Sequence, residues 1–156
     1  MSFSENTPSS SSSAFERFGF SPPVSRGIAA AGFDQPRPIQ ARAIPAALAG
    51  RDVMGLAQTG TGKTAAFALP IIERLARQPS SSVRALVLAP TRELATQIQA
   101  EFQSLARFTG LDAVALFGGV SIHKNIRALR RNPDIVVGCP GRVLDLIGRR
   151  LLRLDA

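Results

Sequence analysis

The sequence predicts an α/β fold in which a parallel sheet is covered by helices on both faces. Short apolar runs alternate with longer segments of helical periodicity after about residue 20. The runs are apolar at successive positions, which is typical of strands buried on both faces. The chain has 156 residues, of which 45% are hydrophobic, so it is long enough for one domain with a core.

The amino-terminal residues differ from the rest of the chain. Residues 1–13 read MSFSENTPSSSSS. Such a Ser-rich segment contains too few apolar side chains to fold, so it predicts a flexible leader. Ordered structure is expected to begin near Phe15, which makes 14–156 the folded part. We find no internal repeat.

Strands and helices are expected to alternate through the folded part. The expected strands are Val53–Ala57, Ala85–Ala89, Ala113–Phe117 and Ile135–Gly138. The expected helices are Val24–Ala31, Ile39–Ala49, Lys63–Arg77, Arg92–Arg107 and Ser121–Arg131. A parallel sheet of this kind binds its ligands at the carboxyl ends of the strands.

A glycine-rich turn connects the first expected strand to the helix that follows it. The pattern Gly-x-Gly-Lys-Thr occupies Gly60–Thr64. Gly60 and Gly62 allow backbone angles at which successive N–H groups point toward phosphate oxygens. Lys63 can reach the β- and γ-phosphates, and Thr64 can offer its hydroxyl to Mg²⁺. The usual motif begins with Gly, where this chain has Ala57. The pattern predicts a nucleotide site.

The charge of the chain indicates an anionic partner. The net charge is +8, and 17 of the 19 basic residues are Arg, which favours a nucleic acid or a nucleotide over a membrane surface. The single Cys139 excludes an internal disulfide and indicates a reducing compartment. The sequence contains neither a signal-peptide pattern nor an apolar run long enough to span a membrane. We therefore expect a cytoplasmic protein.

Five ordered motifs resemble those of DEAD-box RNA helicases. Residues 57–64, AQTGTGKT, resemble the AxTGxGKT phosphate loop of superfamily-2 helicases, and residues 32–40, GFDQPRPIQ, resemble the Q motif. The family carries an isolated aromatic residue 17 positions before the first Gly of the Q motif, and Phe15 stands there. Residues 90–95, PTRELA, match motif Ia; 117–119, FGG, match the GG motif. Cys139–Arg142, CPGR, resembles motif Ib, which usually reads TPGR.

The resemblance implies a RecA-like P-loop NTPase domain that binds ATP and Mg²⁺, with a Q motif over 14–40 and a P-loop over 57–64. By resemblance Gln40 reads the adenine edge, Phe15 stacks on the base and the backbone of Gln35 completes adenine selection. Lys63 and Thr64 are the expected catalytic residues, and Thr64 is the expected metal ligand. The full set of expected ATP contacts is Phe15, Gln35, Gln40, Gln58, Thr59, Gly60, Thr61, Gly62, Lys63 and Thr64.

The resemblance also implies an RNA-binding edge. The expected contacts are Pro90, Thr91, Arg92, Gly118, Gly119, Gly141 and Arg142. Helix amino termini, glycine N–H groups and arginines suit phosphate oxygens, so binding should tolerate any sequence and weaken with salt. Cys139 departs from the family, because a thiol is a poor substitute for the Thr hydroxyl that contacts RNA. The basic runs around Arg130 and Arg150 are interpreted as solvated helix faces.

The carboxylates that the family uses for metal and water are missing. The family's Asp-Glu-Ala-Asp motif follows motif Ib, whereas the only acidic residues after Arg142 are Asp145 and Asp155. We therefore expect 14–156 to be the N-terminal part of the first RecA-like domain, incomplete at its C-terminus and inactive alone. The brevity and the Phe-rich flank favour a bacterial member.

Three other functions are compatible with parts of the sequence. A naturally short, non-catalytic module that binds nucleotide or RNA is the main alternative to a helicase. A P-loop kinase or another NTPase is disfavoured by the Q motif. A DNA helicase is disfavoured because the Q motif together with PTRELA is typical of the RNA-directed branch.

Overall fold

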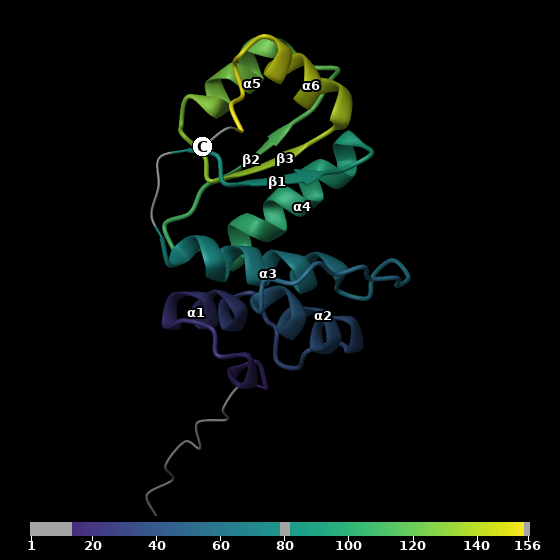
Figure 1. Ribbon diagram of the computed structural model, residues 1–156, viewed down its shortest axis with the longest axis vertical. Coiled ribbons are helices and arrows are strands. Elements are labelled where there is room, and N and C mark those ends of the chain that lie inside the picture. Colours follow the sequence, from purple (N-terminus) through teal and green to yellow (C-terminus); the bar gives the residue numbers. More distant parts are fainter. Residues whose placement is uncertain (1–13, 79–81, 155–156) are drawn as a thin grey trace, which may run out of the picture.

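The sheet consists of three parallel strands. The computed structural model describes residues 14–78 and 82–154, so the predicted leader lies outside the described residues (Figure 1). The strands β1 (Ala85–Leu88), β2 (Ala113–Leu116) and β3 (Ile135–Gly138) lie in the spatial order β1-β3-β2. Both Ala85 and Ala113 pair with Ile135. All four residues of the central strand β3 are buried, which confirms the predicted parallel sheet with a fully apolar strand.

Helices cover both faces of this sheet. Helix α4 (Arg92–Leu105) packs on one face, and α5 (Ile122–Leu129) and α6 (Pro140–Gly148) lie over the other (Figure 1). The core between the sheet and α5 and α6 is formed by Val114, Leu116, Val136, Val143, Leu146 and Leu152. The larger core lies on the α4 side and includes Phe102, Leu105, Ile135 and Val137. The prediction of a sheet covered on both faces is confirmed.

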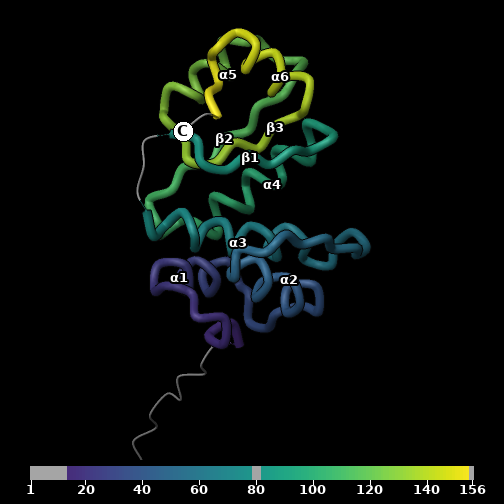
Figure 2. The backbone as a smooth tube through the Cα atoms, in the orientation of Figure 1, coloured from purple at the N-terminus to yellow at the C-terminus, as the bar shows by residue number. Residues whose placement is uncertain are grey.

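A further layer of helices lies beyond α4. Helices α1 (Pro22–Ala30), α2 (Pro38–Leu48) and α3 (Lys63–Ala76) stack away from the sheet, and a short 3₁₀ helix at Glu16–Phe18 precedes them (Figure 2). Helix α1 approaches α4 so closely that a Cβ on Gly27 would lie 2.0 Å from the Leu105 carbonyl oxygen. The buried Glu73 of α3 accepts hydrogen bonds from the backbone N–H and the hydroxyl of Ser21, both at 2.9 Å. These contacts fix α1 against α3 and α4.

The predicted helices are confirmed, with ends that differ by one or two residues. Helix α4 begins at the predicted residue because Thr91 caps it, accepting a hydrogen bond from the Leu94 N–H at 3.2 Å. It ends at Leu105 instead of Arg107, and Gly110 follows in the left-handed conformation at φ 77°. Among the described residues, no helix is both long and apolar enough to cross a membrane.

The predicted strand at Val53–Ala57 is wrong for this structure. Residues 51–58 contain neither helix nor strand, and no described strand lies beside them. The apolar side chains of this segment are exposed, to 90% for Met54 and 92% for Leu56. A strand needs hydrogen bonds to a neighbouring strand, so an apolar run alone does not form one. The phosphate loop therefore follows an unpaired extended segment.

Candidate functional site

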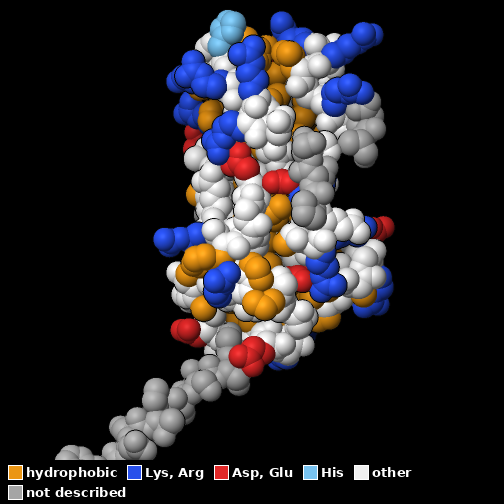
Figure 3. All heavy atoms as spheres, turned by 90° about the vertical axis from the view of Figure 1, so that its left-hand side faces the viewer, with side chains coloured by type: hydrophobic (Ala, Val, Ile, Leu, Met, Phe, Trp, Pro, Cys, Tyr) orange, Lys and Arg blue, Asp and Glu red, His pale blue; other side chains and the backbone are white. Residues whose placement is uncertain are grey.

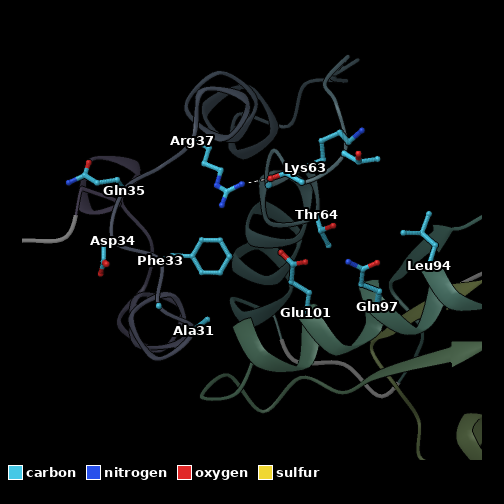
Figure 4. Close-up of a pocket in the computed structure, with 14 residues that line it drawn as sticks. Ala31, Phe33, Asp34, Gln35, Arg37, Lys63, Thr64, Leu94, Gln97 and Glu101 are labelled. Carbon is cyan, nitrogen blue, oxygen red and sulfur yellow. Dashed lines mark hydrogen bonds between the residues drawn. The ribbon is translucent and has the colours of Figure 1, made fainter.

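The phosphate loop borders a cavity of about 760 Å³, which is large enough for a nucleotide. Three separate parts of the chain surround it: the segment between α1 and α2, the loop before α3, and one face of α4 (Figure 4). The lining residues are Ala31, Gly32, Phe33, Asp34, Gln35, Arg37, Thr59, Gly60, Gly62, Lys63, Thr64, Leu94, Gln97 and Glu101.

The loop has the conformation that its glycines predict. Gly60 and Gly62 have φ angles of 77° and 83°, in the left-handed region that favours glycine. Gly62 is the N-cap of α3, so the first N–H groups of that helix point toward the loop. The Lys63 ammonium donates to the Ala57 carbonyl oxygen at 2.5 Å, and the Thr61 hydroxyl donates to the Gln58 carbonyl oxygen at 2.7 Å. This arrangement suits an anion, because the helix presents N–H donors and Lys63 adds a positive charge beside them.

Two side chains at the start of α2 hold the loop in place. The fully buried Gln40 donates from Nε2 to the Gly62 carbonyl oxygen at 3.1 Å. Its Oε1 accepts a hydrogen bond from the Arg37 N–H at 2.9 Å. The Arg37 guanidinium donates to the Gly60 carbonyl oxygen, as the dashed line in Figure 4 marks. In this conformation Gln40 connects the Q-motif segment to the phosphate loop.

The structure brings together some of the predicted ATP contacts and not others. Those that line the cavity are Gln35, Thr59, Gly60, Gly62, Lys63 and Thr64; those that do not are Phe15, Gln40, Gln58 and Thr61. Phe15 is only 2% exposed and packs edge-on against Phe18 and Phe33, with ring centroids 5.8 Å and 6.2 Å away. Phe33, not Phe15, is the aromatic residue at the cavity. Stacking of a base on Phe15 stays a prediction.

Sequence reasoning missed more than half of the cavity wall. The unpredicted lining residues are Ala31, Gly32, Phe33, Asp34, Arg37, Leu94, Gln97 and Glu101. One signal was available on α4, where Leu94, Gln97 and Glu101 follow at intervals of three and four residues and so share a helix face. Two polar residues on such a face indicate only that the face is not packed in the core. Nothing local in the sequence indicates which other segment faces it.

Glu101 is the acidic side chain that α4 contributes to the cavity. Its side chain points toward Thr64 at the beginning of α3 (Figure 4). Burial raises the pKa of the Glu101 carboxyl, and hydrogen bonding to the Thr64 hydroxyl and to the Ala65 backbone offsets this effect only in part. A half-buried carboxylate therefore lies at the helix end where the sequence predicts phosphate.

The other predicted motifs lie together at the carboxyl edge of the sheet. Pro90, Thr91 and Arg92 follow β1, Gly118 and Gly119 follow β2, and Gly141 and Arg142 follow β3. Because the three strands are parallel, these ends share one edge. In Figure 1 the arrowhead of β1 points toward the side on which the loop before α3 also lies.

The two arginines of this edge are held differently. Arg92 is exposed and pairs with its neighbour Glu93 at 3.2 Å. The pKa of Glu93 is lowered by hydrogen bonds from its own backbone and from Arg92. The Arg142 side chain is 14% exposed and donates from one terminal nitrogen to the Val120 carbonyl oxygen at 3.4 Å. Its other terminal nitrogen is buried without a hydrogen-bond partner among the described residues. Arg142 thus connects motif Ib to Val120, the residue that follows the GG motif.

Basic side chains gather around α5 and the end of α6, as Figure 3 shows. Two of them are ion-paired, Arg131 with Asp112 at 2.8 Å and Arg149 with Asp145 at 2.7 Å. The remaining members, Lys124, Arg127, Arg130 and Arg150, are exposed. These observations fit the prediction of solvated helix faces. The described part of the chain contains no cluster of three or more His, Cys, Asp or Glu side chains that could hold a metal ion.

Comparisons with known proteins agree on one family. The profile of the DEAD/DEAH box helicases matches residues 37–155. The chain is 48% identical over 141 residues to the ATP-dependent RNA helicase CshA of Listeria monocytogenes, and 45% identical to the DEAD-box ATP-dependent RNA helicase CshA of Bacillus subtilis. Each match covers 90% of this chain but only 27% and 28% of those relatives. The chain thus spans less than a third of their length.

Solved structures give the same result. A DEAD box protein from Methanococcus jannaschii matches with a TM-score of 0.83 and 39% identity, over 90% of this chain and 38% of that one. The RNA helicase Prp28 from Chaetomium thermophilum, solved bound to ADP, matches with a TM-score of 0.82 and 42% identity, over 90% and 35% of the two chains. The similarity at this identity extends to the fold and the family.

Proposed function

Since the chain belongs to the DEAD/DEAH box helicase family, we propose that it supplies the ATP-binding loop and part of the RNA-binding edge of an ATP-dependent RNA helicase. In the whole protein, ATP hydrolysis would be coupled to local opening of an RNA duplex. The cytoplasm is the proposed compartment.

One observation carries the ATP part of this proposal. The loop Gly60–Thr64 opens α3 with two left-handed glycines and borders a cavity of nucleotide size. The related Prp28 structure, 42% identical to this chain, was solved with ADP. The free N–H groups at the start of α3 would bind phosphate oxygens, and Lys63 would move from the Ala57 carbonyl to the outer phosphates.

Magnesium fits these residues only in part. The Thr64 hydroxyl offers one hard oxygen ligand, and phosphate oxygens would supply others. The described residues contain no acidic cluster, and the sequence contains no Asp-Glu-Ala-Asp motif. Phosphoryl transfer without carboxylates to place the metal and the water loses most of its electrostatic stabilisation. We therefore assign nucleotide binding, and not hydrolysis, to these residues.

The carboxyl edge of the sheet supports the RNA part of the proposal. It carries an exposed Arg92, two exposed glycines at Gly118 and Gly119, and the amino end of α6. The buried terminal nitrogen of Arg142 has a free donor that a phosphate oxygen reaching this edge could satisfy. Contacts of this kind bind the backbone and do not read the bases.

The test is nucleotide binding by the intact protein as the cell makes it, measured by calorimetry with ADP and ATP. The variant Lys63→Ala should abolish measurable binding, whereas Lys124→Ala, which removes the other lysine on exposed α5, should leave it unchanged. Binding that is insensitive to Lys63→Ala would refute the proposed site. Nucleotide and RNA binding without RNA-stimulated ATP hydrolysis would favour the non-catalytic binding module instead of a helicase.

A further inference from the structure

Helix α5 turns a basic face to solvent. The cations that form this face, in the helix and in the turn that ends it, are Lys124, Arg127, Arg130 and Arg131. They follow one another at intervals of three and four residues, which places neighbours about 5–6 Å apart on one side of a helix. The opposite side packs on the sheet through Ile122, Ala128 and Leu129. We call the four cations the α5 basic face, and they belong to the gathering of Lys and Arg in Figure 3.

The positive charge of the α5 basic face is largely unbalanced. Helix α5 contains no Asp or Glu. Arg131 pairs with Asp112 at 2.8 Å, but within the described residues no ion pair includes the other three members of the face. Cations three or four positions apart destabilise a helix, and the helix dipole disfavours a cation in the first turn, where Lys124 lies. Helix stability therefore does not account for this arrangement, whereas an anionic partner does.

The α5 basic face extends from one edge of the sheet to the other. Helix α5 begins just after the glycines that follow β2, at the carboxyl edge that the proposed function assigns to RNA, and Lys124 lies in its first turn. At the other end of the face, Arg131 bonds to Asp112, which directly precedes β2 at the amino edge. A strand of RNA that leaves the carboxyl edge over α5 thus meets a continuous row of cations.

The composition of the face suits a phosphate backbone better than a protein or a membrane. None of the large hydrophobic side chains that are exposed in the described part of the chain belongs to α5. Protein interfaces depend on apolar or aromatic anchors, and a helix that lies on a membrane buries an apolar face in the lipid. Guanidinium groups bind phosphate oxygens through paired, charge-assisted hydrogen bonds. A face with cations and without an apolar anchor therefore fits phosphate.

We propose that the α5 basic face is a second contact for RNA, which binds the phosphate backbone of the strand beyond the carboxyl edge of the sheet. This inference rests on the proposed function and extends its RNA-binding surface toward the amino edge. The face is solvated in the free protein, and phosphate oxygens replace that water on binding. The contact is ionic and reads no base, so it lengthens the stretch of RNA that the protein covers without adding a sequence preference.

The test uses the intact protein and the triple variant Lys124→Gln, Arg127→Gln, Arg130→Gln. Fluorescence anisotropy measures the affinity for single-stranded RNAs of about 6 and about 20 nucleotides, of which the shorter covers the carboxyl edge and the longer also reaches α5. Each ionic contact to a single strand contributes about 0.7 to the slope of log association constant against log salt. For the longer RNA, the variant should make this slope shallower by about 2 and lower the affinity about 100-fold at about 0.1 M salt. For the shorter RNA, it should match the wild type.

A matched control removes three exposed arginines that form no ion pair among the described residues: Arg42→Gln, Arg51→Gln and Arg74→Gln. These residues lie in or beside α2 and α3, in the helical layer away from the sheet (Figure 1). The control has the same change in net charge and should bind both RNAs as the wild type does. Equal slopes in the two triple variants would overturn the inference, and so would an equal loss of affinity for both RNA lengths.

Two further measurements protect the test. The three substitutions lie at exposed positions and relieve repulsion, so the variant should melt no lower than the wild type. If it does melt lower, Arg127→Gln alone should still make the slope shallower by about 0.7, and an unchanged slope would refute the contact. Phosphatidylglycerol vesicles are the alternative probe. Loss of vesicle binding with unchanged affinity for the longer RNA would mean that the face binds lipid and that the inference is wrong.

The two proposals fail in different ways. If the wild type binds neither RNA, the RNA part of the proposed function fails. If the wild type binds both RNAs but the triple variant behaves as the control does, the carboxyl edge stands and only the role of α5 is wrong.

Discussion

Gln40→Ala tests how the Q-motif segment acts on the phosphate loop. The side chain is 0% exposed and makes two hydrogen bonds, one to the Gly62 carbonyl at 3.1 Å and one from the Arg37 N–H at 2.9 Å. A glutamine amide has two donor hydrogens and an oxygen with two lone pairs, so one donor and one lone pair are not used by these two bonds. Because Gln40 is buried and does not line the cavity, reading adenine would require its side chain to become accessible. Two roles are thus compatible: bracing the loop, and reading the base as the family resemblance implies.

The structure sets the size of the bracing effect. Alanine loses the bond to Gly62, and a typical intramolecular hydrogen bond contributes about 0.5–1.5 kcal/mol. If the phosphate-binding conformation of the loop loses the same free energy, the affinity for phosphate falls by a factor of about 2–10. The Arg37 N–H also loses its acceptor, but Arg37 is exposed and water can take that place, so the loss of folding stability is that of an ordinary hydrogen bond, about 0.5–1.5 kcal/mol.

Pyrophosphate separates the two roles because it carries no base. We expect Gln40→Ala to bind pyrophosphate about 2–10-fold more weakly, and to lose in addition its preference for ATP over GTP. The assay is calorimetry with pyrophosphate, ATP and GTP on the intact protein, with a thermal melt to confirm that the variant is folded at the working temperature. Gln99→Ala is the control, since that glutamine bonds the Ala113 carbonyl outside the cavity.

Each role can be refuted alone. Unchanged pyrophosphate affinity would show that the bond to Gly62 does not organise the loop. The same ATP-to-GTP ratio in variant and wild type would remove Gln40 as the adenine reader.

Three further predictions concern stability and RNA. Gly27→Ala puts a methyl carbon 2.0 Å from a carbonyl oxygen of α4, so chemical denaturation should show a free energy of unfolding lower by about 1–3 kcal/mol. In the control Gly148→Ala the methyl group has open space, and the free energy of unfolding should be unchanged or rise by up to about 1 kcal/mol. Equal effects of the two substitutions would contradict the close packing of α1 on α4. Glu73→Ala leaves the part-buried N–H and hydroxyl of Ser21 without their acceptor and should cost about 1–3 kcal/mol in the same assay. A loss below about 0.5 kcal/mol would disprove its structural role. The logarithm of the RNA association constant should fall linearly with the logarithm of the salt concentration, and Arg92→Ala should make this slope shallower by about 0.7. An unchanged slope would mean that Arg92 does not contact phosphate.

Local patterns predicted the helices and the paired strands well. Helix α4 begins where Thr91 and the apolar spacing place it, and β3 has the predicted residues because four successive apolar positions suit a central strand. The same reasoning failed at Val53–Ala57. That run is equally apolar, but pairing depends on a neighbouring strand, and a single run does not encode its neighbour.

The cavity lining was predictable along the phosphate loop and, by the family resemblance, at Gln35. Gly60, Gly62 and Lys63 were found because their chemistry depends on residues adjacent in sequence. The contact of Gln40 with Gly62 spans 22 residues, and Glu101 meets Thr64 from a different helix. Such juxtapositions result from packing of α2, α3 and α4, which no short window of sequence contains. For the same reason the sequence did not indicate that Phe33 lines the cavity, since the aromatic spacing does not say which ring faces inward.

The contacts of the loop indicate why its affinity for nucleotide should be modest. The carbonyl groups of Ala57, Gly60 and Gly62 accept from Lys63, Arg37 and Gln40. A phosphate that draws Lys63 away from the Ala57 carbonyl breaks that hydrogen bond as it forms new ones, so the binding free energy is the difference between the bonds formed and the bond lost. The hydrogen bonds from Arg37 and Gln40 to the loop remain, and they hold its conformation with and without phosphate. Variants that remove them should therefore change the affinity for all phosphates in the same direction.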